Sequence, residues 1–251
     1  MTQSQVTHLW RYPIKSHGRE CLHAVDLQVG KVFPWDRYWA VQHDHSDHEV
    51  DGWIPCQNFM RGAITPGLAG LSATLDEANR RVTVSHNDLG NFSFRPDDAT
   101  QATEFLDWIV PLIDVKRSKP RRIVTARHIG LTDTDFASIS VMNLATNQVI
   151  SETVKCPVEI ERWRGNIWLE GVEPWQEFEW VGRHIRVGGA ILKVRELIGR
   201  CLHTAANPRT GKRDLDLPRL LQEHWGHTDF GIYAEVTEAG RVSVGDRAEL
   251  I

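Results

Sequence analysis

The residue in this chain whose type and position best suit it to chemistry is Cys201. It stands in segment 198–204, Ile-Gly-Arg-Cys-Leu-His-Thr, after an apolar stretch and before the turn-forming run Asn-Pro-Arg-Thr-Gly at 207–211. The neighbouring cation, Arg200, favours the thiolate, which is the form that attacks electrophiles and binds soft metals. The alternative is a buried structural cysteine, which is the commoner role of a lone cysteine.

The remaining cysteines, Cys21, Cys56 and Cys156, do not extend Cys201 into a known motif. No cysteine lies in a CxxC pair, and no Cys/His spacing matches a zinc ribbon or an iron–sulfur run. A dithiol exchanger and a protease-like nucleophile are therefore poor interpretations of Cys201. The N-terminal residues lack the basic and apolar parts of a signal peptide, so we expect reduced thiols in the cytoplasm.

Basic side chains recur beside turns and strand ends. They lie in 12–16 (Tyr-Pro-Ile-Lys-Ser), in 35–39 (Trp-Asp-Arg-Tyr-Trp), in 161–167 (Glu-Arg-Trp-Arg-Gly-Asn-Ile) and at Arg200. Arginine forks and lysine point charges suit a phosphate group, and Ser16 and Asn166 add neutral groups for a polar heterocycle. Each segment taken singly is also consistent with a surface ion pair, and spacing alone does not show that the segments converge.

Composition describes an ordinary soluble globular protein. The chain has 251 residues, 41% hydrophobic and 25% charged, with 29 basic against 33 acidic residues and a net charge of −4. This balance argues against a nucleic-acid binder driven by bulk charge, but it allows a local basic pocket. No apolar run is long enough to span a membrane.

The pattern along the chain predicts mainly β structure with a few helices, because short alternating segments are separated by Gly, Pro, Asn and Asp. The predicted strands are residues 6–10, 38–41, 71–75, 81–85, 159–163, 167–169, 184–187, 191–197 and 230–236, with a short last strand after 242–246. Turns are expected at 77–80 and at Gly188-Gly189. No β-α-β alternation supports a Rossmann sheet.

Helical spacing appears at three places. Asp98 is a candidate N-cap for a helix with apolar residues at i, i+3, i+4 and i+7 from Ala102, ended by Pro111. A second helix is expected over 216–225, with Pro218 in its first turn. Residues 143–151 could form another helix, which their asparagines disfavour.

The strongest candidate boundary is Arg-Pro-Asp-Asp at 95–98, before the first predicted helix. We therefore predict two compact β-rich domains, residues 1–96 and 97–251, both built as β-barrels. No period of 20 to 50 residues recurs, which excludes a repeat array.

The chain resembles MOSC-domain proteins that carry an N-terminal MOSC-type β-barrel domain, the group that includes the amidoxime-reducing components. The matching pieces, in order, are Tyr-Pro-Ile-Lys-Ser at 12–16, Asp-Arg-Tyr-Trp at 36–39, Arg-Trp-Arg-Gly-Asn-Ile at 162–167, Trp-Gln-Glu at 175–177, Gly182, Arg-Cys at 200–201, Asn-Pro-Arg-Thr-Gly at 207–211, Phe-Gly-Ile-Tyr at 230–233 and Val-Gly-Asp at 244–246. They cover nearly the whole chain.

This resemblance implies a molybdenum cofactor of the molybdopterin type, with Cys201 as the protein thiolate on the metal. The positions that match the family's pterin and phosphate contacts are Lys15, Ser16, Arg37, Arg162, Arg164 and Asn166, together with Arg200. High-valent molybdenum with dithiolene sulfurs accepts a further thiolate readily. The phosphate carries about two negative charges, so a cationic pocket inside an acidic protein is no contradiction.

The resemblance further implies an oxidoreductase that reduces small N-hydroxylated substrates such as amidoximes and N-hydroxylated bases. The cofactor supplies the redox chemistry and the protein orients it. A proton donor is needed, and water, Ser140 and Thr204 are the candidates. The cysteine spacing of a plant-type ferredoxin module is absent, so we expect a separate electron donor: a ferredoxin, a flavoprotein or a cytochrome-b5-like protein.

Two other functions remain open. In a carrier, Cys201 would hold sulfur or the cofactor without turnover; the chain is too short to add the pyridoxal-phosphate domain of a cofactor sulfurase, so no pyridoxal phosphate is expected. A non-catalytic β-barrel interaction module would contain no molybdenum. Separately, His43, His45 and His48 stand among carboxylates in 43–49, a pattern that can bind zinc or nickel, although a solvated loop is the favoured interpretation.

Overall fold

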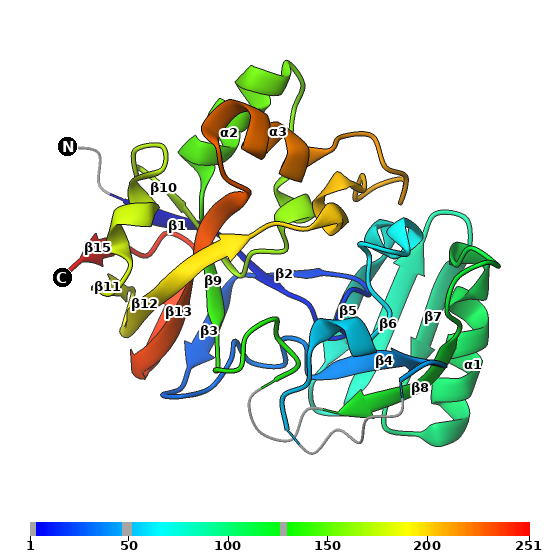
Figure 1. Ribbon diagram of the computed structural model, residues 1–251. Coiled ribbons are helices and arrows are strands. Elements are labelled where there is room, and N and C mark those ends of the chain that lie inside the picture. The colour runs from blue at the N-terminus through cyan, green and yellow to red at the C-terminus, as the bar shows by residue number, and fades with distance from the viewer. Residues whose placement is uncertain (1–3, 47–51, 126–129) are drawn as a thin grey trace.

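The computed structural model describes residues 4–46, 52–125 and 130–251, and it confirms a mainly β chain with a few helices (Figure 1). The strands of the larger sheet run in the spatial order β15 (Ala248–Leu250), β11 (His184–Val187), β12 (Ala190–Gly199), β13 (Asp229–Glu238), β9 (Ile139–Asn143), β10 (Ile167–Glu170), β1 (Gln5–Arg11) and β2 (Glu20–Leu22). The N-terminal strand thus lies inside a sheet built mostly from the second half of the chain.

Neighbouring strands in this sheet are antiparallel except β9 and β10, which run parallel. The helix α2 (Leu144–Val154) makes the crossover between them, as parallel strands require. Register shifts interrupt the long β12–β13 pair at three places, and the last of these lies at the end of β12, directly before Arg200. The sheet therefore ends in an irregular edge at the point where Cys201 follows.

The other strands form smaller sheets beside the large one (Figure 1). They are β4 (Trp39–His43) with β8 (Pro120–Thr125), β5 (Ser72–Asp76) with β6 (Arg81–His86) and β7 (Gly90–Phe94), and β3 (Ala24–Leu27) with β14 (Gly240–Ser243). The helix α1 (Ala99–Ile109) packs on this side, whereas α2 and α3 (Leu217–Trp225) lie over the large sheet. Short 3-10 helices connect the elements: η1 (Cys56–Asn58), η2 (Pro66–Gly70), η3 (Val110–Leu112), η4 (Ile160–Trp163), η5 (Gln176–Trp180) and η6 (Leu202–Ala205).

Three apolar clusters make up the interior. The first lies within the large sheet and includes Leu9, Ile139 and Ile232. The second lies between α1 and the strands β4 to β7, where Phe94 and Phe105 stack with ring centroids 4.3 Å apart. The third packs α2 and α3 on the sheet around Trp163 and Phe230. Apolar burial on this scale is the main stabilising contribution to the fold.

The helices follow the sequence signals closely. Asp98 caps α1 by accepting from the backbone N–H groups of Thr100 and Gln101, as predicted. Pro218 stands in the first turn of α3, and Gly226 ends that helix with a φ of +76°. Asn143, whose presence argued against α2, is its N-cap and accepts from the N–H of Ala145.

Two structural predictions need correction. Residues 159–163, predicted as a strand, contain η4 (Ile160–Trp163) instead, where the Arg162 backbone N–H donates to the Glu159 carbonyl and the Arg162 Nε donates to Glu159 Oε2 at 2.6 Å. Among the described residues, the strand pairings do not close any sheet into a ring, so the predicted barrels are not found. Barrel closure depends on strand tilt and stagger, which local sequence does not encode.

The division of the chain at residues 96 and 97 stays a prediction. Strand pairs cross that point, since β1 pairs with β10 and β4 pairs with β8. No helix in the described ranges is long and apolar enough to cross a membrane.

Candidate functional site

The predicted site residues gather in one pocket between the large sheet and the N-terminal segments. All of them except Asn166 line it, namely Lys15, Ser16, Arg37, Arg162, Arg164, Arg200 and Cys201. They come from the turn after β1, the loop before β4, the end of η4 and the end of β12. The fold thus brings together segments that are up to 186 positions apart (201 − 15), a convergence that spacing alone could not show.

Cys201 is exposed and lines this pocket, and it follows the end of β12 with only Arg200 between. Its backbone is extended, with φ −110° and ψ 174°, and it precedes the short helix η6. Its carbonyl oxygen accepts from the N–H of Thr204 at 3.1 Å and from Thr204 Oγ1 at 3.0 Å. The backbone of Cys201 is therefore held while its thiol stays accessible, which suits a metal ligand better than a packing residue.

Arg200 points into the wall of the protein rather than toward a ligand. Its Nε donates to the carbonyl of Phe230 and its Nη1 to the carbonyl of Trp163, both at 2.8 Å. A further contact joins its Nη2 to the sulfur of Met142 at 3.3 Å. Burial lowers the pKa of Arg200 to about 10. The Arg200 side chain connects β13 to η4 by hydrogen bonds. Although Arg200 is next to Cys201 in the sequence, its main role is therefore structural.

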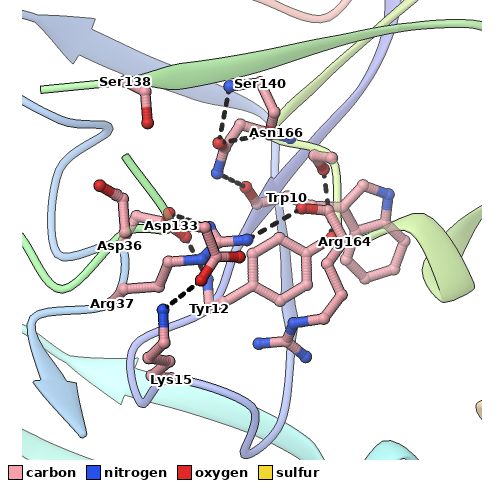
Figure 2. A network of polar contacts seen from close by, with 12 residues as sticks. Trp10, Tyr12, Lys15, Asp36, Arg37, Asp133, Ser138, Ser140, Arg164 and Asn166 are labelled. Atoms are coloured by element: carbon pink, nitrogen blue, oxygen red, sulfur yellow. Dashed lines mark hydrogen bonds and ion pairs between the residues drawn. The ribbon is translucent and has the colours of Figure 1, made fainter. Parts of the chain in front are cut away.

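Tyr12 is a fully buried residue that does not itself line the pocket but has two pocket cations against its ring (Figure 2). The guanidinium carbons of Arg164 and Arg37 lie 4.1 Å and 4.9 Å from the ring centroid. Asp36 fixes this group, since its Oδ1 accepts from the N–H of Tyr12 at 2.8 Å and its Oδ2 pairs with Arg37. Cation–π contacts of this kind hold guanidinium groups in place without using their donors.

Several of these residues have backbones in the left-handed region, which non-glycine residues seldom adopt. The φ angles are +65° at Ser16, +50° at Arg37 and +53° at Arg164. Each such residue costs about 1–3 kcal/mol, and such strain concentrates at functional sites. Its recurrence at three predicted site residues supports a functional role for the pocket.

Arg164 has unused hydrogen-bonding capacity. Its Nη1 donates to the carbonyl of Gly18 at 3.3 Å, and its Nη2 is buried with no hydrogen-bond partner among the described residues. Burial and the charge of Arg37 lower its pKa to about 9. A buried donor without an acceptor is costly, and an anion in the pocket would relieve that cost.

Lys15 already has a partner on the protein. Its Nζ donates to Asp133 Oδ1 at 2.6 Å (Figure 2). It also donates to the carbonyl of Leu131 at 2.8 Å. Although burial opposes the change, the charges of Lys15 and Arg37 lower the pKa of Asp133 to about 2. The carboxylate therefore stays ionised and offsets part of the positive charge at this end of the pocket.

Arg162 is the most fully paired cation of the site. It is 2% exposed and it joins η4 to the chain that follows Cys201, because it contacts both Glu159 and Asp214. Its Nη1 and Nη2 meet the two carboxylate oxygens of Asp214 at 2.8 Å and 2.9 Å. Burial opposes a higher pKa, but the hydrogen bonds to Asp214 and Glu159 raise it. Although Arg162 lines the pocket, its main role is therefore to stabilise the fold through its ion pairs.

Asn166 does not line the pocket but ties three strands together beneath it. Its Oδ1 accepts from the N–H and the hydroxyl of Ser140, and its Nδ2 donates to the carbonyl of Trp10 at 3.1 Å (Figure 2). The Ser140 hydroxyl thus donates to Asn166 Oδ1 at 2.8 Å, and the Thr204 hydroxyl donates to the carbonyl oxygen of Cys201 at 3.0 Å. Both hydroxyls, which were candidates for the proton donor, therefore already donate a hydrogen bond within the protein.

The structure adds pocket residues to which the sequence analysis gave no role, among them Cys56, Arg61, Gly62, Ala63, Asp133, His203 and Tyr233. Burial lowers the pKa of His203 to about 3, so the ring is neutral, and burial raises the pKa of Tyr233. The hydroxyl of Tyr233 has no hydrogen-bond partner in the described part of the chain. The only available signal was the Phe-Gly-Ile-Tyr piece at 230–233, because segment 56–63 carries no motif.

The histidine-rich segment 43–49 lies partly outside the described residues, since 47–51 are not described. His43 Nε2 contacts the carbonyl of Gln57 at 2.8 Å, and the rings of His43 and His45 are 6.2 Å apart. Within the described ranges, no group of three or more His, Cys, Asp or Glu side chains is arranged to hold a metal ion.

Comparison with known proteins accounts for the second half of the chain, where the model of the MOSC domain matches. Residues 129–249 are a MOSC domain. The domain is associated with binding of the molybdenum cofactor in general, and Cys201, Arg162, Arg164 and Arg200 lie inside it. Lys15, Ser16 and Arg37 lie outside it, so the MOSC domain supplies only part of the pocket.

Solved structures that match this chain include YuaD from Bacillus subtilis, at 13% identity and a TM-score of 0.47, over 99% of this chain and 95% of that one. YiiM from Geobacillus stearothermophilus (20% identity, TM-score 0.36) and YiiM from Escherichia coli (15%, 0.31) each match 45% of this chain. This chain covers about half of either YiiM protein, 53% in both cases. No curated protein matches the sequence.

Proposed function

We propose that this MOSC protein binds a molybdenum cofactor in the pocket and reduces N-hydroxylated compounds with electrons from a separate donor protein. The observation that carries the proposal is that one pocket contains both an exposed thiol, Cys201, and the guanidinium of Arg164, which has a buried donor without an acceptor among the described residues. A phosphate-bearing metal cofactor needs both kinds of group, a soft thiolate for the metal and a fixed cation for the phosphate.

The residues of the pocket fit that group in their donor chemistry. Cys201 would ligate the metal, and Arg164, Arg37 and Ser16 would hold the phosphate and the pterin. Lys15 contributes less than the sequence suggested, because Asp133 shares its charge. When bound, the cofactor supplies two-electron redox chemistry that the side chains cannot provide.

The protein must also manage protons, since converting an N–OH group to N–H with release of water consumes two electrons and two protons. Tyr233 and Ser16 line the pocket, and their hydroxyls have no hydrogen-bond partner in the described residues. Burial raises the pKa of Tyr233, so its hydroxyl stays protonated through the neutral range. These two hydroxyls, rather than Ser140 and Thr204, are available to pass a proton within the pocket.

Metal analysis tests the proposal most directly. Protein purified from a host that makes the cofactor should contain about one molybdenum per chain, and Cys201→Ala should lose most of it. Cys156→Ala is the matched control, because that thiol is partly buried and does not line the pocket. Molybdenum in the Cys201→Ala protein at the wild-type level would contradict the ligand assignment.

Activity then separates turnover from carriage. The loaded wild-type protein should reduce benzamidoxime with an artificial reductant, and Cys201→Ala should not. Molybdenum binding without reduction by any electron donor would favour the carrier, in which the accessible Cys201 delivers its load to another protein. Absence of molybdenum from the wild-type protein would favour a non-catalytic interaction module.

A further inference from the structure

We propose that Arg61 is an anion-recognition residue of this pocket and that the physiological substrate carries a carboxylate group. The inference rests on the proposed reductase function and narrows its substrate class. Two features support it: the way in which each cation of the pocket is already used, and the place of Arg61 relative to Cys201.

Most cations that line the pocket are neutralised or fully hydrogen-bonded by the protein. Lys15 pairs with Asp133. Arg37 pairs with Asp36. Arg162 pairs with Glu159 and Asp214, and Arg200 spends its donors on backbone carbonyls and a thioether. The two that keep buried donors without acceptors in the described part of the chain are Arg164, at Nη2, and Arg61, at Nε.

Arg61 is the less satisfied of these two side chains. A guanidinium has five N–H donors, and the hydrogen bond found for the Arg61 side chain within the described chain is Nη1 to the sulfur of Cys56 at 3.6 Å. Sulfur is a weak acceptor, and no carboxylate of the described residues lies within ion-pair distance of Arg61. A partly buried guanidinium whose donors are so poorly satisfied by the protein is suited to bind a carboxylate through two parallel N–H···O hydrogen bonds.

The position of Arg61 assigns it to the substrate rather than to the cofactor phosphate. The next residue, Gly62, packs on His203, since a Cβ added to Gly62 would fall 2.0 Å from His203 Nδ1. Segment 61–63 therefore lies against the turn that begins at Cys201, where the substrate must approach the metal. Arg164 lies instead on the ring of Tyr12, beside Gly18. Arg61 and Arg164, the two cations with unsatisfied donors, therefore lie beside different parts of the pocket, so each is able to bind a separate anion.

The test compares two substrates that differ in one group, benzamidoxime and 4-carboxybenzamidoxime, on the molybdenum-loaded protein. We expect the wild-type protein to favour the carboxylated compound in kcat/KM. Arg61→Gln should lower the ratio of the two kcat/KM values by about 10- to 100-fold, mainly through the KM of the carboxylated compound. Arg61→Lys should retain part of the preference, because it keeps the charge but loses the fork.

Arg219→Gln is the control, since Arg219 is an exposed cation on α3 that pairs with Glu223 and does not line the pocket. It should leave the ratio unchanged. A ratio in Arg61→Gln equal to that of the wild-type protein overturns the inference. So does a loss of molybdenum from Arg61→Gln, because Arg61 would then hold the cofactor.

Failure of the reductase function gives a different result. If the loaded wild-type protein reduces neither compound, the proposed function is wrong, and the anion site is then judged by calorimetric titration. Binding of 4-carboxybenzamidoxime that weakens about 10-fold or more in Arg61→Gln supports the site. Equal binding to the two proteins overturns it.

Discussion

Replacing Arg162 by methionine tests whether this guanidinium serves the framework or the ligand. Methionine keeps much of the volume and removes every hydrogen bond of the side chain. The substitution deletes the 2.6 Å bond to Glu159 and the two-pronged pair with Asp214 at 2.8 Å and 2.9 Å. It also deletes the longer hydrogen bonds, at 3.4 Å, to the carbonyl groups of Thr204 and Ala205, so the turn after Cys201 is released as well.

Removal of one partner from a buried ion pair costs about 3–5 kcal/mol in the free energy of unfolding. The side chains of Glu159 and Asp214 are 21% and 42% exposed, so both carboxylates regain water when the arginine is gone. We therefore expect a loss of about 2–3 kcal/mol, which for a chain of this length lowers the thermal midpoint by about 4–12 °C.

The assay is urea denaturation followed by circular dichroism, with Arg186→Met as the matched control. Arg186 pairs with Glu249 at 3.5 Å on the surface, and the two side chains are 45% and 35% exposed. Loss of this ion pair should lower the free energy of unfolding by less than about 1 kcal/mol. A double-mutant cycle with Asp214→Asn should give a coupling energy of about 1–2 kcal/mol. If Arg162→Met is as stable as Arg186→Met yet loses molybdenum, the guanidinium acts on the ligand and the structural assignment is refuted.

Three further measurements follow from particular residues. Gly240→Ala should destabilise the protein by about 3 kcal/mol or more, because the added Cβ would lie 2.1 Å from the carbonyl oxygen of Gly189; a loss under about 1 kcal/mol in urea denaturation would contradict this close approach. Gly62→Ala should cost about 1–3 kcal/mol, since it displaces the ring of His203, whereas Gly52→Ala meets nothing within 4 Å and serves as its control. Burial lowers the pKa of His17 to about 4 from 6.5, so the unfolded chain binds the extra proton first and stability falls as pH drops from 6.5 toward 4. His17→Gln should reduce that slope by up to about 1.4 kcal/mol per pH unit, and an unchanged slope would show that His17 is not the group responsible.

Much of the secondary structure was predictable because its signals are local. The cap at Asp98, the turn at Gly188-Gly189 and the final strand after 242–246 depend on residues only a few positions apart. The prediction failed where a distant contact overrides local preference. Residues 159–163 were predicted as a strand, yet residues 160–163 form η4, in which Arg162 pairs with Glu159 and with the distant Asp214.

The sequence by itself also determined which reactive groups the site contains, because residue type decides which side chains are able to ligate a metal or hold a phosphate. Cys201, Arg164 and Arg37 were predicted in this way, and the fold brings them together in one pocket. What sequence could not decide was how each cation is used. Arg200 and Arg162 are the same residue type as Arg164, but their donors are spent on the protein.

Only the tertiary structure revealed Arg61, since its importance lies in what is missing around it among the described residues. A free donor is defined by the absence of an acceptor in three dimensions, and no motif or spacing records that. The same holds for Ser140, whose hydroxyl is a candidate proton donor by sequence. In the fold this hydroxyl donates a hydrogen bond to Asn166 Oδ1. Sequence sets the inventory of donors, thiols and charges; packing decides which of them remain available to a ligand, because each pairing is made between segments distant along the chain.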